Sequence, residues 1–161
     1  MSRKEIPPTS TRPPAHDPNP QIDFPILFDH EKLEVYQASI AFCGWAGELF
    51  ETLPRVAARD QLDRASTSIP LNLAEGNGKF SAADRARFFE IARGSAVECA
   101  ACLDVLVARK FTSRDTMRPA KEQLASIVRM TVGLLKRFSP RANVLQEEAA
   151  GYGDHEQEHE K

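Results

Sequence analysis

Three polar residues have types and spacing that could do chemistry. Asn72 and Glu75 stand one helical turn apart, and Ser95 follows in a second polar segment. A carboxylate, an amide and a hydroxyl can bind a polar ligand, but no His, Lys or Cys at a suitable spacing supplies a nucleophile or a proton shuttle. We therefore predict no catalytic residues. We favour a buried polar cluster that sets the register of two helices, with a ligand site as the alternative.

Cys99 and Cys102 have the spacing of a metal or redox pair. They lie in the middle of an apolar run, whereas a redox pair is expected at the start of a helix, where the thiolate is stabilised. No second pair of ligands lies nearby in the sequence, and no zinc motif or glycine-rich phosphate loop is present. We predict that both thiols pack in the core, and that the chain uses no metal and no cofactor.

Two groups of basic residues could bind phosphates. They are Lys79, Arg85, Arg87 and Arg93, and then Arg109, Lys110, Arg114 and Arg118. Residues 28 to 140 carry 16 Lys and Arg against 14 Asp and Glu, so any binding of nucleic acid needs a local patch. Each group alone is typical of a solvated helix face. In a symmetric oligomer, however, every patch repeats in each subunit, which would give a near-neutral protein a continuous basic surface.

The elements that position these residues are helices, because apolar residues recur at steps of three and four. The patterns run from Asp29, as a cap, to Pro54; over 59–77; onward from Ser81; and over 114–138. Ser81 is a good N-cap with Asp84 as a capping-box-like partner, and the fourth pattern could become regular a few residues after Arg114, since Pro119 suits a first turn. The predicted fold is all-α, an antiparallel up-down four-helix bundle.

The first helix carries two apolar stripes. We expect the inward seam to be Leu33, Tyr36, Ile40, Cys43, Gly47 and Phe50. The second stripe, about 120° round the helix axis, is Val35, Phe42, Ala46, Leu49 and Leu53. The third helix could cover both stripes within one chain. We favour the other interpretation, in which the second stripe is a subunit interface, because a continuous exposed apolar patch is costly for a monomer.

Proline and glycine mark special positions in the second and third helices. Pro70 cannot bond to the carbonyl of Ser66, so we expect a kink, with nearby hydroxyls satisfying the freed carbonyl. We expect Gly76 and Gly78 to allow a left-handed end to the helix. Gly94, like Gly47 in the first helix, would let a neighbouring helix approach closely.

The two ends of the chain read differently from the middle. Residues 1–27 hold seven prolines and should form an extended, flexible arm; 28–140 are the bundle; and 141–161 should be an acidic, disordered tail. No signal peptide or membrane span is evident, and three cysteines without an export signal indicate reduced thiols. We therefore expect a cytoplasmic protein.

Two segments carry a resemblance to a known family. They are Ser68-Ile-Pro-Leu-Asn-Leu-Ala-Glu-Gly76 and Ile91-Ala-Arg-Gly-Ser95, preceded by an opening from Phe28 that is close to the family's usual one. The chain resembles the 23S rRNA intervening-sequence proteins of bacteria. The resemblance implies a four-helix bundle assembled into a ring of five, and no established activity.

A related branch of proteins carries a further implication. Accessory variability determinants of diversity-generating retroelements bind nucleic acid and a reverse transcriptase through a basic pentamer, whereas the bundle here is near neutral. From residues and resemblance together we expect a non-enzymatic, oligomeric scaffold, and the resemblance implies that the oligomer is a pentamer. We expect it to bind RNA, DNA or a partner protein such as a reverse transcriptase. The alternative is a protein-interaction module without affinity for nucleic acid.

Overall fold

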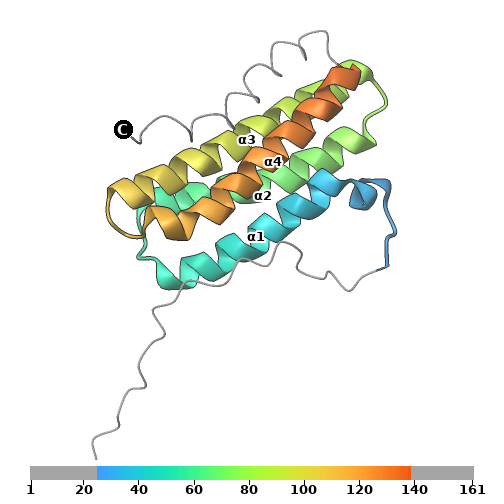
Figure 1. Ribbon diagram of the computed structural model, residues 1–161. Coiled ribbons are helices and arrows are strands. Elements are labelled where there is room, and N and C mark those ends of the chain that lie inside the picture. Colours follow the sequence, from blue (N-terminus) through green and yellow to red (C-terminus); the bar gives the residue numbers. More distant parts are fainter. Residues whose placement is uncertain (1–24, 139–161) are drawn as a thin grey trace, which may run out of the picture.

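The computed structural model describes residues 25–138, which form one short turn and four long helices (Figure 1). A 3₁₀ turn, η1 (Asp29–Lys32), precedes α1 (Glu34–Thr52), α2 (Ala57–Gly78), α3 (Ala82–Ala108) and α4 (Arg114–Phe138). The four predicted helices are confirmed, and α2 begins two residues earlier than its apolar pattern indicated.

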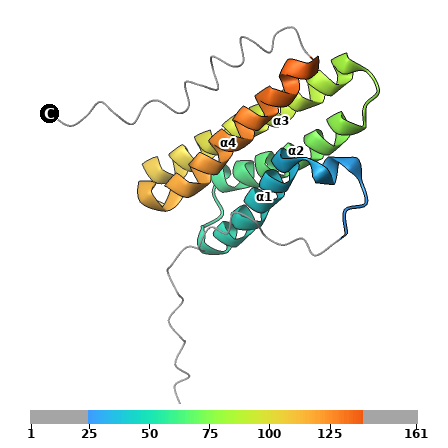
Figure 2. The ribbon, with the colours of Figure 1, turned by 45° about the vertical axis from the view of Figure 1, so that its right-hand side comes forward.

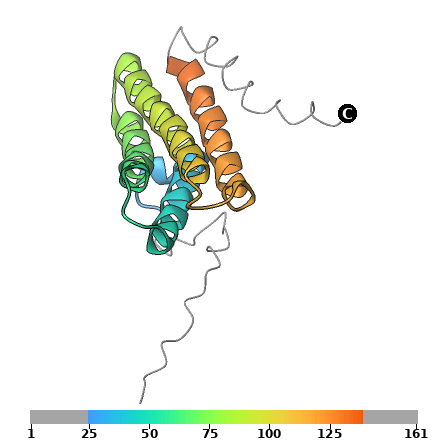
Figure 3. The same ribbon diagram turned by 90° about the vertical axis from the view of Figure 1, so that its left-hand side faces the viewer.

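The four helices form an antiparallel bundle. Consecutive helices lie side by side and alternate in direction, and α4 returns to pack against α1 (Figures 1 and 2). Seen obliquely from one side, α2, α3 and α4 follow one another across the bundle and α1 lies beneath them (Figure 3). The short loops leave two opposite ends, which we name the α2–α3 end and the α3–α4 end after the loop that each contains. The all-α four-helix fold expected from the sequence is confirmed.

The core takes the stripe of α1 that the sequence analysis assigned to a subunit interface. The exposed fractions of Val35, Phe42, Ala46, Leu49 and Leu53 run from 0 to 8%. These residues join the hydrophobic core of the described residues, so that interface assignment is wrong. The physical reason is that α1 contacts both α2 and α4, and two neighbours cover a wider face than the single seam we had allowed for.

The stripe predicted to face inward lies at the edge of the core instead. Leu33, Tyr36 and Phe50 are half-buried, and Gly47 is exposed with no atom within 4 Å of the place its Cβ would occupy. The prediction that a neighbouring helix approaches closely at Gly47 is therefore wrong. The same holds for Gly94, whose surroundings are equally open.

The helix ends follow the expected chemistry at some positions and depart from it at others. Ser81 Oγ accepts the backbone N–H of Asp84 at 3.0 Å, which confirms the N-cap. Asp29 does not cap α1. It begins η1, and Glu31 accepts the N–H groups of Leu27 and Phe28. Helix α4 is regular from Arg114, because the Ser113 hydroxyl accepts the N–H of Thr116 at 3.2 Å.

The carbonyl freed by Pro70 has a partner from another helix. Pro70 lies inside α2, and the Cys43 thiol of α1 donates to the Ser66 carbonyl at 3.1 Å. The Ser66 hydroxyl is one of the nearby hydroxyls that we expected to donate to this carbonyl. It donates to the Asp63 carbonyl instead. A buried carbonyl needs a donor, so this thiol links α1 to α2 at the proline.

Gly76 has a packing role rather than a terminating one. A Cβ at Gly76 would lie 2.8 Å from the Phe89 ring and 3.0 Å from Phe88 Cβ. Helix α2 continues to Gly78, and no described glycine has a positive φ. Gly76 therefore lets α2 and α3 approach closely near the α2–α3 end.

Parts of the chain assigned from composition lie outside the described residues. These are the predicted arm, apart from residues 25–27, and the predicted acidic tail at 141–161. Among the helices of residues 25–138, none combines the length and the apolarity that crossing a bilayer requires.

Candidate functional site

The polar cluster between α2 and α3 is built around Ser68. The Ser95 hydroxyl donates to Ser68 Oγ at 2.8 Å, and Asn72 Nδ2 donates to the carbonyl and the hydroxyl of Ser68 at 2.8 and 3.0 Å. Ser95 is 8% exposed and Asn72 is half-buried. The structure thus brings Asn72 and Ser95 together through a third residue that the sequence analysis had not placed in the cluster.

Glu75 does not belong to this cluster. Its side chain is about half exposed and accepts an ion pair from Lys79 Nζ at 3.0 Å, one turn along α2. The remaining groups are two hydroxyls and an amide. The Ser95–Ser68 bond joins α3 to α2, whereas Asn72 and Ser68 both lie in α2. Such a set can help to align the two helices and contains no proton-transfer group.

The cysteines sit within the bundle. Cys99 and Cys102 are buried, and Cys43 is half-buried. Burial raises the pKa of Cys43 to about 11 and raises the pKa of Cys99 further. Burial also raises the pKa of Cys102, so all three thiols are protonated at neutral pH and poor nucleophiles. Residues 25–138 contain no group of three or more His, Cys, Asp and Glu placed to hold a metal ion.

The basic residues of the α2–α3 end are mostly engaged in contacts within the chain. Lys79 pairs with Glu75 and lies 4.8 Å from the centre of the Phe88 ring. Arg85 Nε donates to the Lys79 carbonyl at 2.6 Å, and its guanidinium lies over Phe138 at 5.4 Å.

The other two members of this group differ from each other. Arg93 is half-buried near the middle of α3, away from the end. Arg87 is exposed and forms no ion pair with another described residue. Only one of the four predicted cations at this end is thus fully available to a partner.

The α3–α4 end presents its basic residues differently. Arg109, Lys110 and Arg114 are exposed, and none forms an ion pair within the described part of the chain. Arg118 lies 3.9 Å from Asp115, at the outer limit of an ion pair. All four predicted cations here are exposed, and three of them form no ion pair with a described residue.

Lys110 occupies a backbone conformation that is unusual for its residue type. Its φ is 62°, the only positive value among the described non-glycine residues. The Lys110 N–H bonds to the Val107 carbonyl at 2.9 Å and the Phe111 N–H to the Leu106 carbonyl at 3.0 Å, which is the Schellman pattern that ends many helices. Glycine is the usual residue there, because a Cβ costs about 1 kcal/mol or more in this region.

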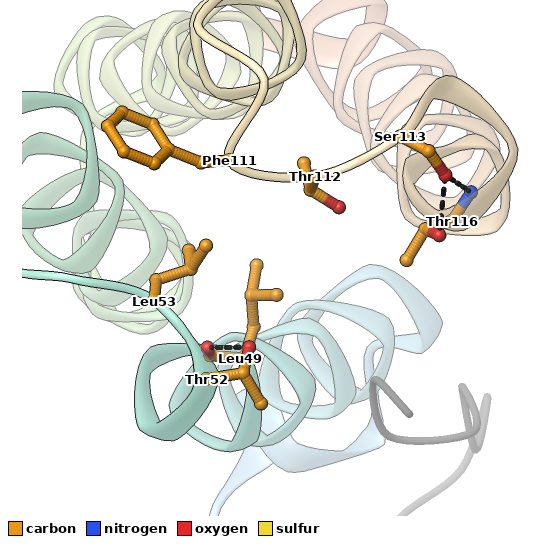
Figure 4. Close-up of a pocket in the computed structure, with 7 residues that line it drawn as sticks. All are labelled: Leu49, Thr52, Leu53, Phe111, Thr112, Ser113 and Thr116. Atoms are coloured by element: carbon orange, nitrogen blue, oxygen red, sulfur yellow. Dashed lines mark hydrogen bonds between the residues drawn. The ribbon is translucent and has the colours of Figure 1, made fainter. Parts of the chain in front are cut away.

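A pocket of about 300 Å³ lies at the same end, and some of its lining residues are neighbours of these cations in the sequence (Figure 4). Leu49, Thr52 and Leu53 come from the end of α1, and Phe111, Thr112, Ser113 and Thr116 come from the α3–α4 loop and the start of α4. Phe111 lies across the pocket from Leu53, and the Ser113 and Thr116 hydroxyls are 2.7 Å apart (Figure 4). None of the lining residues is an acid, a base or a thiol.

This pocket could not be recognised from the sequence. Its residues come from two segments about 60 positions apart, and neither carries a motif. The only local signal was Phe111, a large apolar residue placed in a predicted loop next to two cations.

Comparisons with known proteins agree with the fold. The model of the family described as 23S rRNA-intervening sequence protein matches residues 31–133. A crystal structure from Bacteroides thetaiotaomicron, of a protein of unknown function from the S23 ribosomal protein family, is 23% identical. The similarity covers 63% of this chain and 98% of that one, with a TM-score of 0.61. No curated protein matches significantly.

Neither description names an enzymatic activity. The solved structure shares the helical fold, and the family model spans more than half of the chain and includes both signature segments. The chain belongs to the family of 23S rRNA-intervening sequence proteins.

Proposed function

We propose that this protein is a non-enzymatic scaffold that assembles with copies of itself and binds nucleic acid through its repeated basic groups. The observation that carries the proposal is the set of exposed cations at the α3–α4 end. Arg109, Lys110 and Arg114 lie within six consecutive residues and are not paired with any described carboxylate. Unpaired, exposed cations are the groups that bind phosphates by releasing counterions.

Self-association would multiply this patch. One subunit offers too few cations for tight binding, but a symmetric assembly presents the same patch once per subunit. A ring of five, the assembly implied by the resemblance, would have a mass of about 90 kDa from 17.9-kDa chains.

An exposed apolar face on α3 is the surface we propose for assembly. It is made of Ile91, Gly94, Ala101, Val105 and Ala108. Ile91 and Val105 are 42 and 43% exposed, and only Glu98 interrupts the stripe. Leu71 of α2, which is 62% exposed, adds to the exposed apolar residues of these two helices. A helix that is apolar on most sides needs a covering partner, and here one side has none among residues 25–138.

Light scattering with a charge substitution tests the assembly. Ile91→Glu should lower the particle mass, because it places a charge in the proposed interface. Arg129→Glu, which places the same side chain at an exposed position of α4 and changes the net charge by two units rather than one, is the control and should leave the mass unchanged. A particle of one chain for the unsubstituted protein would contradict the assembly.

Fluorescence anisotropy with labelled RNA and DNA across a salt series tests the binding. Binding through phosphates should weaken steeply as salt rises, because each phosphate contact releases counterions. Absence of binding to either nucleic acid at low salt would remove this function.

The second candidate is a protein-interaction module without affinity for nucleic acid. Phe80, in the α2–α3 loop, has an exposed fraction of 103%, and Leu27 and Phe28 are 74 and 62% exposed. Large apolar side chains of this kind anchor protein interfaces. A partner such as a reverse transcriptase, as in the related branch, would use this end. Absence of nucleic-acid binding together with an intact oligomer would favour this candidate.

A further inference from the structure

The pocket at the α3–α4 end combines three chemical features in one place. Its volume, about 300 Å³, is at the lower end of the range for small-molecule sites. Phe111 remains 39% exposed, although a ring of its size is normally covered in a folded chain. Leu49 and Leu53 lie opposite it and supply an apolar floor (Figure 4).

Hydroxyl groups form the second feature. Thr112, Ser113 and Thr116 line the side of the pocket formed by the loop and the start of α4. The Ser113 and Thr116 hydroxyls bond each other, and an oxygen in such a pair keeps a free lone pair. These hydroxyls can therefore hydrogen-bond to the edges of a ligand whose flat apolar face packs against Phe111.

The third feature is positive charge on residues that adjoin the lining residues in the sequence. Arg109 and Lys110 directly precede Phe111, and Arg114 directly follows Ser113. All three are exposed and unpaired with described carboxylates. Lys110 stands where glycine would relieve the backbone, and a conformation held at a cost is often found at a binding site.

A flat ring with hydrogen-bonding edges, joined to a negatively charged backbone, matches all three features. We propose that this pocket binds one unpaired nucleotide of an RNA or DNA strand, with the base against Phe111 and the flanking phosphates on Arg109, Lys110 and Arg114. This inference rests on the proposed nucleic-acid binding and adds which form is recognised. A base within a duplex is stacked and paired, so it cannot enter, whereas bases of single strands stack readily on aromatic side chains.

The experiment compares single strands with duplexes. The full-length protein is titrated with a labelled RNA oligonucleotide, with the DNA of the same sequence, and with the blunt duplex of each, at one salt concentration. We expect the single strands to bind on the order of 10-fold more tightly than the duplexes, since stacking of one base on an aromatic ring has about that effect. Equal affinities would overturn the proposal.

Substitutions at Phe111 assign the effect to the pocket. Phe111→Leu keeps an apolar side chain without a π face and should weaken single-strand binding about 10-fold while leaving duplex binding unchanged. Phe111→Trp keeps a π face and should bind single strands as tightly as the unsubstituted protein does. Phe80→Leu, the same change at an exposed position of the opposite end, is the matched control and should have no effect.

A fluorescent base gives a readout that a structural role would not change. 2-Aminopurine in the single strand should lose fluorescence on binding to the unsubstituted protein and to Phe111→Trp, and keep it with Phe111→Leu. Circular dichroism checks that each variant keeps its helices. A loss of affinity in Phe80→Leu but not in Phe111→Leu would overturn the pocket and keep nucleic-acid binding. No binding of any oligonucleotide at low salt would remove the proposed function, and this inference with it.

Discussion

The two groups of predicted phosphate-binding cations contain four residues each, but the two ends of the bundle use their members differently. At the α2–α3 end, Lys79 is tied to Glu75 and Phe88, and Arg85 to a backbone carbonyl and Phe138. At the α3–α4 end, three cations are exposed beside a pocket. Of the predicted cations, three are therefore exposed and unpaired at the α3–α4 end, and one at the α2–α3 end.

The difference comes from packing near the ends of the helices. Gly76 brings α2 and α3 together at one end, where the Phe89 and Phe138 rings lie 5.9 Å apart and nearby cations cover aromatic surface. At the other end α3 stops in a left-handed turn, and its loop stands over the end of α1 and leaves a pocket. The α2–α3 end is a packed closure, and the α3–α4 end is an open surface.

Removing charge from each end in turn is the strongest test of this contrast. Replacing Arg109, Lys110 and Arg114 with Gln should weaken binding of nucleic acid on the order of 100-fold at low salt. The slope of log affinity against log salt should fall by about two to three, because up to three phosphate contacts are lost. Anisotropy titrations at several salt concentrations measure both quantities.

The matched control removes three exposed charges from the opposite end. Arg87, Lys136 and Arg137 are exposed and form no ion pair with a described residue. Replacing them with Gln removes the same total charge and should leave most of the affinity and the slope unchanged. Equal losses in both triple variants would mean that the contrast between the ends does not govern binding.

The next test breaks the packed end. Gly76→Ala should lower the free energy of unfolding by about 1 to 3 kcal/mol, because its methyl group would overlap the Phe89 ring and crowd the Cβ of Phe88. Gly133→Ala is the control. Its Cβ would meet no atom, so it should be neutral or stabilising by up to about 1 kcal/mol. Urea denaturation gives both values, and a neutral Gly76→Ala would show that the two helices can separate there at little cost.

The sequence predicted the fold well because the helix signals are local. Spacing of apolar residues, the Ser81 cap and the short loops each depend on a few neighbouring residues. It did not predict which stripe of α1 faces inward, because both stripes have helical spacing and the choice depends on the positions of α2 and α4.

The candidate sites depended on contacts between distant segments. Three features join residues that are far apart in the chain. They are the Cys43–Ser66 hydrogen bond, the Ser68–Ser95 hydrogen bond, and the pocket between α1 and the α3–α4 loop. Basic residues could be located from the sequence, but whether a nearby carboxylate or ring engages them could not. The engagement of Lys79 and Arg85 is a property of the packed helices.

A smaller effect is expected at the left-handed residue. Lys110→Gly should raise the free energy of unfolding by about 1 kcal/mol, because glycine adopts a φ of 62° without a steric penalty. The same variant should weaken binding of nucleic acid, since it removes a phosphate contact. Thermal unfolding and anisotropy measured on one preparation check the two directions. A variant that is both more stable and fully active would show that Lys110 has no role in binding.

The smallest effect is expected from the engaged cation of the packed end. Lys79→Gln should change the free energy of unfolding by about 1 kcal/mol or less, because its pair with Glu75 is partly exposed and such pairs contribute little. Binding of nucleic acid should stay almost unchanged, whereas Arg114→Gln should reduce it and lower the salt slope by about one. If instead Lys79→Gln reduced binding as much as Arg114→Gln, Lys79 would have to leave Glu75 and Phe88 to reach a phosphate. The packed end would then be a second binding surface, and the two ends would differ only in the contacts they make before a ligand arrives.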